Sequence, residues 1–69
     1  MNEDEKMDAI ADIFEKDASA LTPDLALDTL QWDSMAMLSV IALAKSVGKP
    51  VSGLVIRKMK TIADILAVL

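Results

Sequence analysis

The apolar side chains near the start of the chain recur at a spacing that only an α-helix gathers on one face. Five of them fall at i, i+3, i+4, i+7 and i+11, namely Met7, Ile10, Ala11, Phe14 and Ala18. Strict alternation of apolar and polar residues, which marks a half-buried strand, is absent from the chain. We therefore predict a helix from about residue 3 to residue 18 in an all-α fold.

A second helix is predicted from Ser34 to Ser46, because Gly48 and Pro50 end the apolar run that follows Ser34. One face of this helix gathers Met37, Val40, Ile41, Ala44 and Val47. The opposite face holds Met35, Leu38, Ser39, Ala42, Lys45 and Ser46. A helix that is apolar on nearly all sides is either fully buried or offers one face to a partner. A chain of 69 residues makes complete burial difficult, so we expect an exposed apolar face.

The rest of the chain predicts one long loop and two further helices. Pro23 disfavours a helical conformation at the preceding residue, so residues 19–33 form an ordered loop, anchored by Leu21, Leu25, Leu27 and Leu30. Ser52 can cap a short helix over residues 53–59, and Thr61 opens the last helix with a capping-box-like pattern that ends at Asp64. We predict a single domain, residues 1–69, built as a small four-helix bundle with three longer helices and a short third helix.

The residue types that are missing from the chain exclude several kinds of site. Without cysteine there is no disulfide and no thiolate metal site, and without histidine the usual general base and the commonest metal ligand are absent. The longest apolar stretch, MAMLSVIALA, is too short to span a membrane, and the acidic start does not resemble a signal peptide. We therefore expect a cytoplasmic protein that is not an enzyme and that uses no metal and no membrane.

Charge is distributed unevenly along the chain. The net charge of -4 argues against nucleic acid as a partner. Residues 1–34 hold ten acids against Lys6 and Lys16, which gives -8. Residues 35–69 hold one acid, Asp64, against five bases, which gives +4; the bases are Lys45, Lys49, Arg57, Lys58 and Lys60. The half of the chain that contains most of the second helix is therefore basic.

The stretch LQWDSMAML places Asp33 and Ser34 between a tryptophan and an apolar helix. The simplest interpretation is that Ser34 caps the helix, since serine is a favoured residue at that position. A catalytic role for Ser34 is poorly supported, because no histidine exists to act as its base and no G-x-S-x-G motif is present. A third interpretation is that Ser34 is a point of covalent attachment.

The chain resembles the acyl carrier protein family over nearly all of its length. The resemblance is carried by LTPDLALDTLQWDSMAML and by VGKPVSGLVIRKMKTIADIL. In that family an Asp-Ser-Leu or Asp-Ser-Met triplet opens the second helix. The resemblance implies that Ser34 receives a phosphopantetheine arm from coenzyme A, added by a phosphopantetheinyl transferase, and that the thiol of the arm carries acyl groups as thioesters. It also implies that Asp33 helps to hold the transferase and its metal ion. Because no linker flanks the domain, we expect a freestanding protein, and we expect it to be a monomer.

Departures from the family pattern indicate a specialised carrier. Carriers of fatty acid biosynthesis often have an acidic second helix, whereas this helix has Ser39, Lys45 and Ser46 on its outward face, and Arg57 and Lys58 follow. We therefore expect a carrier for modified-lipid or polyketide biosynthesis, with acyl-loading and acyl-processing enzymes as partners. An amino-acyl or peptidyl carrier is the alternative, although LQWDS lacks the glycine-rich approach usual in those domains.

A different class remains open beside the carrier. The chain can also be a plain helical interaction module in which Ser34 is only a helix cap. In both cases we predict that Met35, Leu38 and Ala42 form the surface that contacts protein partners. Trp32 is interpreted as a plug over the loop rather than as a contact for the acyl chain.

Overall fold

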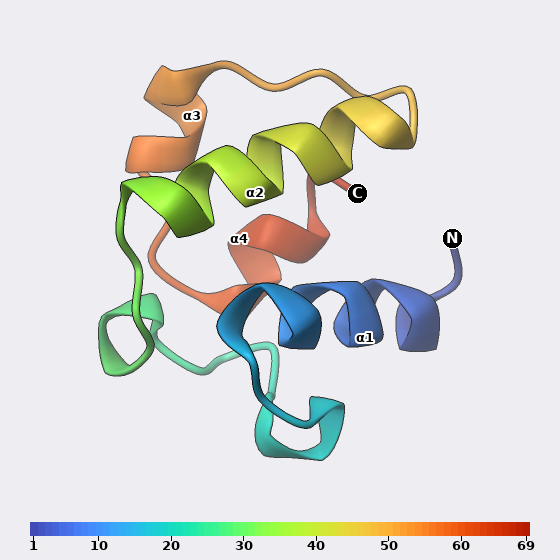
Figure 1. Ribbon diagram of the computed structural model, residues 1–69, viewed down its shortest axis with the longest axis vertical. Coiled ribbons are helices and arrows are strands. Elements are labelled where there is room, and N and C mark those ends of the chain that lie inside the picture. The colour runs from blue at the N-terminus through green and yellow to red at the C-terminus, as the bar shows by residue number, and fades with distance from the viewer.

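The computed structural model describes all residues from 1 to 69 and contains helices without any strand (Figure 1). The helices are α1 (Glu3–Phe14), α2 (Ser34–Ser46), α3 (Gly53–Arg57) and α4 (Ile62–Leu66), with short 3-10 turns at Ala18–Ala20 and Leu27–Thr29. The prediction of a small all-α fold with four helices is confirmed. The prediction of three longer helices is wrong, because α3 and α4 each have only five residues.

The first helix ends four residues earlier than predicted. It begins with a capping box, in which the Asn2 side chain accepts the N–H of Glu5 at 2.8 Å and the Glu5 carboxylate accepts the N–H of Asn2 at 3.1 Å. It ends at Phe14 because Glu15 adopts a left-handed conformation, with φ of 55°. The N–H of Lys16 then bonds back to the carbonyl of Ala11 at 3.0 Å, which is the Schellman pattern of helix termination. Ala18 still packs against the core, although outside the helix, which is why its spacing suggested a longer helix.

The second helix has the predicted bounds, Ser34–Ser46, but a different cap. Asp33 is the N-cap residue, and its carboxylate accepts the backbone N–H of Ala36 at 3.0 Å. The interpretation of Ser34 as the cap is therefore wrong: Ser34 is the first residue inside the helix. Asp33 takes the position because its backbone is extended there, as a cap requires, whereas Ser34 is already helical. The helix ends before Gly48, whose φ of 77° suits glycine.

The last two helices are short and are capped at residues that the sequence indicated. The hydroxyl of Ser52 accepts the N–H of Val55 at 3.4 Å and so begins α3, which ends at Arg57 rather than at the predicted residue 59. The carboxylate of Asp64 accepts the N–H groups of Lys60 and Thr61 at 2.7 and 3.1 Å. The predicted role of Asp64 at the start of α4 is therefore confirmed.

The long loop between α1 and α2 is held against the start of α4 by backbone hydrogen bonds. Leu27 donates its N–H to the carbonyl of Lys60 at 2.8 Å, and Ile62 donates its N–H to the carbonyl of Leu25 at 3.1 Å. Ala63 adds a bond to the carbonyl of Pro23 at 2.7 Å. These bonds confirm an ordered loop, and they hold the chain that leads into α2.

The core collects side chains from the four helices and from the loop. The buried apolar residues are Ile10, Ala11, Phe14, Leu21, Leu27, Ala36, Val40, Ala44, Ile56, Met59, Ile62, Ile65 and Leu69. Figure 1 shows α4 between α1 and α2, with α3 beside the start of α2. Trp32 is half-buried, and its ring lies 6.1 Å from that of Phe14, centroid to centroid. Trp32 therefore packs against the core beside Phe14.

Candidate functional site

Ser34 stands exposed at the start of α2, and its hydroxyl is free. The helix cap is supplied by Asp33, so the fold makes no use of the Ser34 side chain. The Ser34 hydroxyl takes part in none of the side-chain hydrogen bonds of the structure. Ser34 is therefore sterically available for chemical modification without the loss of a structural contact.

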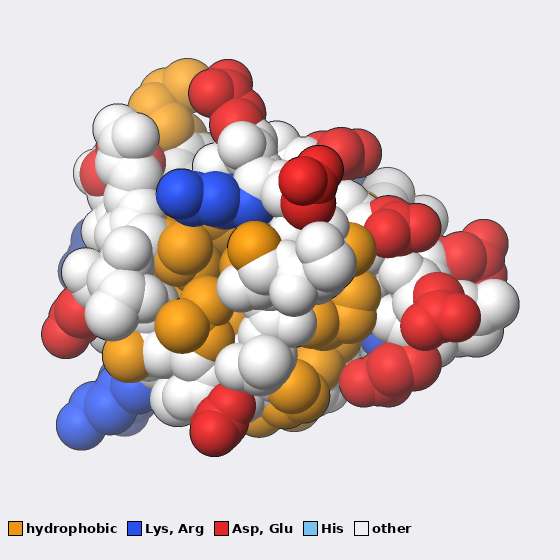
Figure 2. Space-filling model, turned by 90° about the horizontal axis from the view of Figure 1, so that it is seen from below, with side chains coloured by type: hydrophobic (Ala, Val, Ile, Leu, Met, Phe, Trp, Pro, Cys, Tyr) orange, Lys and Arg blue, Asp and Glu red, His pale blue; other side chains and the backbone are white.

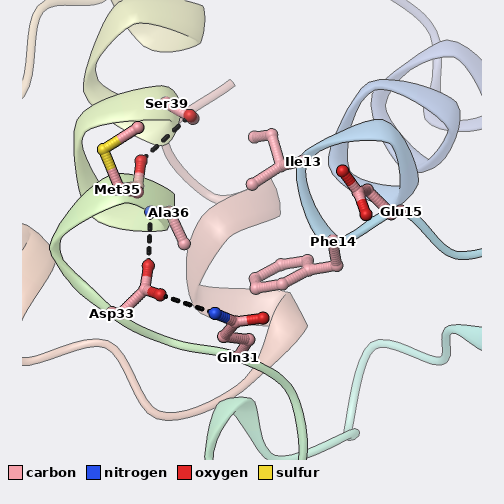
Figure 3. Close-up of a pocket in the computed structure, with 8 residues that line it drawn as sticks. All are labelled: Ile13, Phe14, Glu15, Gln31, Asp33, Met35, Ala36 and Ser39. Atoms are coloured by element: carbon pink, nitrogen blue, oxygen red, sulfur yellow. Dashed lines mark hydrogen bonds between the residues drawn. The ribbon is translucent and has the colours of Figure 1, made fainter.

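Asp33 beside it is held in place by two hydrogen bonds (Figure 3). One carboxylate oxygen accepts the N–H of Ala36 at 3.0 Å, and the other accepts the side-chain amide of Gln31 at 3.0 Å. The bond from Ala36 is the main cause that lowers the pKa of Asp33 below its ordinary value, and the amide of Gln31 adds to it. Asp33 is therefore a charged carboxylate at neutral pH, one residue from the free hydroxyl.

A first groove lies between α1 and α2, and Figure 3 shows the side chains around it. Its volume is about 270 Å³. The lining combines apolar and polar side chains, namely Ile13, Phe14, Glu15, Gln31, Asp33, Met35, Ala36 and Ser39. We call it the α1–α2 groove. Two of the predicted site residues, Asp33 and Met35, border it, whereas Ser34 does not.

A second groove lies between α2 and α3, and this one includes Ser34. It has a volume of about 230 Å³ and is lined by Ser34, Met37, Leu38, Ile41, Gly53, Ile56 and Arg57. We call it the α2–α3 groove. Its walls are mostly apolar, with a hydroxyl on α2 and one cation, Arg57, on α3. Ser34 therefore borders an apolar surface that continues along α2 and α3.

The outward face of α2 is exposed, as the two-faced apolar pattern predicted. Met35 is 73% exposed and Leu38 is 60% exposed, and Ala42 is also exposed. The exposure of Leu38 excludes the possibility that it packs under the preceding loop. The neighbouring helix adds Leu54 and Val55 to the exposed apolar side chains. Of the three predicted contact residues, Met35 follows Ser34 directly and Leu38 lies one turn beyond it. These two border different grooves, whereas Ala42 borders neither.

Charge is distributed unevenly between the elements of the fold. Residues 34–63 contain five bases and no acid, so the surfaces of α2 and α3 carry only positive charge. Ten acids lie in residues 1–34, which form α1 and the long loop. Figure 2 looks at the molecule from below Figure 1, and on that face acidic side chains predominate over basic ones. Along α2 and α3 the exposed apolar face therefore has basic neighbours, whereas on the α1 side Met35 borders a groove with Glu15 and Asp33.

Sequence reasoning named Arg57 and Lys58 together and did not separate them. The structure places Arg57 in the groove with Ser34, whereas Lys58 borders a different groove, with Val55 and Asp64. The signal was present in the spacing of Gly53, Ile56 and Arg57, which fall at i, i+3 and i+4 on one helical face. Gln31 was also missed, because its bond to Asp33 depends on the backbone conformation of residues 31–33.

Comparison with known proteins finds no matching family model, no matching curated protein and no matching solved structure. The structure itself adds two findings about other kinds of site. None of its helices has the length and apolar character needed to cross a membrane. Its acidic side chains form no group of three that could hold a metal ion.

Proposed function

We propose that this protein is a carrier that holds acyl intermediates as thioesters on a phosphopantetheine arm attached to Ser34. The observation that supports this proposal best is the exposed hydroxyl of Ser34, which makes no hydrogen bond because Asp33 caps the helix. In the loading reaction, the serine oxygen forms a bond to the phosphorus next to the pantetheine of coenzyme A. The diphosphate bond breaks, adenosine bisphosphate leaves, and the transferase takes the hydroxyl proton.

The start of α2 suits the phosphodiester that this reaction leaves on Ser34. The first N–H groups of a helix have no partner within the helix, and the positive end of the helix dipole favours an anion. Since the chain contains no cysteine, the thiol that forms the thioester must belong to the arm. We infer that the charged carboxylate of Asp33, one residue away, helps to hold the metal ion of a transferase.

The outward face of α2 is proposed to contact the phosphopantetheinyl transferase through Met35, Leu38 and Ala42. The transferase must reach the Ser34 hydroxyl, and Met35 and Leu38 lie within one helical turn of that residue. Both side chains are mostly exposed, so their burial against an enzyme stabilises a complex without any rearrangement of the core. Acyl-loading and acyl-processing enzymes must approach the same end of α2 to reach the thioester.

The cargo is proposed to belong to a specialised lipid or polyketide pathway. The basic surface of α2 and α3, with no acid in residues 34–63, differs from the acidic second helix common in carriers of fatty acid biosynthesis. An amino-acyl or peptidyl carrier is the alternative cargo class. Acylation assays of the loaded protein with acyl and with aminoacyl donors distinguish the two.

A plain helical interaction module is the second candidate function. It is favoured by one observation, the exposure of Met35 and Leu38 side by side on α2. In that case the apolar face binds a protein partner, and the free hydroxyl of Ser34 has no chemical role. The experiment that separates this candidate from the carrier is a test for covalent loading.

The loading experiment uses the purified protein with coenzyme A and a broad-specificity phosphopantetheinyl transferase. We expect the intact mass to rise by one phosphopantetheinyl group, and Ser34→Ala to abolish the gain. Ser39→Ala is the matched control, because Ser39 is also an exposed serine on α2 but its hydroxyl donates to the carbonyl of Met35 at 3.0 Å. An unchanged mass of the wild-type protein with several transferases contradicts the carrier proposal, and loading that depends on Ser39 contradicts the site.

A further inference from the structure

We propose that Arg57 binds the phosphodiester of the arm on Ser34 and so fixes the direction of the arm in the α2–α3 groove. This inference rests on the proposed carrier function. It adds a positioning residue on a second helix, in a part of the chain that lies 23 residues beyond the attachment point in the sequence, from 34 to 57.

Ser34 and Arg57 belong to opposite walls of one groove. Ser34 lies on α2 and Arg57 lies at the end of α3, and both line the cavity of about 230 Å³ between these helices. Gly53 also lines this groove, and a Cβ atom placed there meets no atom within 4 Å. The groove is therefore open beside Gly53 on the α3 side, and Ser34 and Arg57 share this open space.

Arg57 has no anionic partner within the protein. The chain contains no acid between Asp33 and Asp64, and both of these carboxylates accept hydrogen bonds from other groups. The guanidinium takes part in none of the side-chain hydrogen bonds of the structure. Arginine presents a planar set of donors that matches the oxygens of a phosphate, so a phosphodiester is a suitable ligand for it.

The negative charge of Asp33 makes a cation in the α2–α3 groove more favourable once Ser34 is loaded. Asp33 is ionised at neutral pH and lies next to the serine that would carry the phosphodiester, so loading brings two negative groups together. Like charges at short distance raise the free energy of the loaded state. A guanidinium on the opposite wall of the groove offsets this repulsion. It also draws the arm toward α3 rather than toward the α1–α2 groove, which Glu15 and Asp33 line.

Lys58 supplies a matched control for this proposal. It is the next residue along the chain, it is exposed, and it carries the same charge as Arg57. It does not line the α2–α3 groove and borders a separate groove with Asp64 and Met59. Substitution of either residue by glutamine lowers the net positive charge of this surface equally. Only the loss of Arg57 should affect the phosphodiester directly.

The experiment compares the wild-type protein, Arg57→Gln, Arg57→Lys and Lys58→Gln after loading with phosphopantetheine, with complete loading checked by intact mass. Phosphorus NMR reports the resonance of the phosphodiester, and nitrogen–proton NMR reports the side-chain Nε–H of Arg57 before and after loading. We expect loading to shift the Arg57 Nε–H resonance and to slow its exchange with water several-fold in the wild type and in Lys58→Gln. The phosphorus resonance should shift in Arg57→Gln, less in Arg57→Lys, and not in Lys58→Gln.

The possible results separate a failure of the carrier proposal from a failure of the proposed role of Arg57. If the wild-type protein gains no mass, the carrier proposal fails and this inference fails with it. If the protein is loaded but the Arg57 Nε–H resonance does not respond, the carrier proposal stands and the role of Arg57 is overturned. Equal phosphorus shifts in Arg57→Gln and Lys58→Gln also overturn it, because net charge rather than position would then explain the effect.

Discussion

The carboxylate of Asp33 accepts the backbone N–H of Ala36 at 3.0 Å and thereby caps α2. This bond determines the roles of two adjacent residues that the sequence does not separate. Asp33 stabilises the helix, and Ser34 keeps an unbonded, exposed hydroxyl at its first turn. The capping role therefore belongs to Asp33, and the proposed chemical role of Ser34 can be tested by a separate substitution.

Ser34→Ala should leave the stability of the fold almost unchanged. The hydroxyl makes no hydrogen bond, so we expect the free energy of unfolding to change by less than about 0.5 kcal/mol, as is usual for exposed sites. Asp33→Ala should lower stability measurably, because the N–H of Ala36 loses its partner. Urea unfolding of both variants provides the measurement. A loss in Ser34→Ala equal to that in Asp33→Ala contradicts the assignment of the cap.

The contribution of Asp33 to stability should disappear in acid. Its pKa is lowered in the folded state, mainly by the N–H of Ala36, so the contribution is present above the unfolded pKa of about 3.9. It is lost as the pH falls through the lower pKa of the folded state. Asp33→Asn keeps a capping side chain without this titration. We therefore expect the urea midpoints of wild type and Asp33→Asn to differ more at neutral pH than below the folded pKa; a constant difference contradicts this cause.

Phe14→Ala should be among the most destabilising single substitutions. Phe14 is buried, and its ring lies 6.1 Å from that of Trp32 at the end of the core near Ser34. Removal of a buried phenylalanine ring typically costs about 3 to 5 kcal/mol, a large part of the stability of a small domain. Met35→Ala is the control, because Met35 is mostly exposed. Thermal unfolding followed by circular dichroism measures both, and similar losses would show that Phe14 is not a core residue.

Leu38→Ala should weaken contact with the transferase while the fold remains intact. Leu38 is 60% exposed, so we expect little change in Tm. Loss of about 1.4 kcal/mol of apolar contact corresponds to a tenfold weaker complex, which should appear as a higher KM for the carrier in the loading reaction. Because the contact is apolar, the effect should depend only weakly on salt.

Val55→Ala is the matched control for the Leu38 measurement. Val55 is an exposed apolar residue on the neighbouring helix, and it borders a groove that does not include Ser34. We expect its KM to stay near the wild-type value. A steep salt dependence of the Leu38 effect, or an equal effect of Val55→Ala, contradicts an apolar docking surface centred on Leu38.

Local patterns in the sequence determined much of the secondary structure. The bounds of α2 followed from the apolar run between Asp33 and Gly48, and the role of Asp64 at the start of α4 followed from its spacing to Thr61. The two faces of α2 were also readable, because helical geometry places Met35 and Leu38 away from Val40 and Ala44. These features depend on residues within a few positions of one another.

Tertiary structure decided what depends on distant segments and on single backbone angles. The end of α1 at Phe14 depends on the left-handed conformation of Glu15, which a side-chain pattern does not report. The separation of Arg57 from Lys58 depends on how α3 packs against α2, and the packing brings only Arg57 into the groove with Ser34. The physical reason is that hydrophobic spacing selects which face of a helix is buried, whereas the segment that this face packs against depends on the whole fold. Two hydrogen bonds give an example, one between Leu27 and Lys60 and one between Leu25 and Ile62. They join residues that lie far apart in the sequence, so no local pattern predicts them.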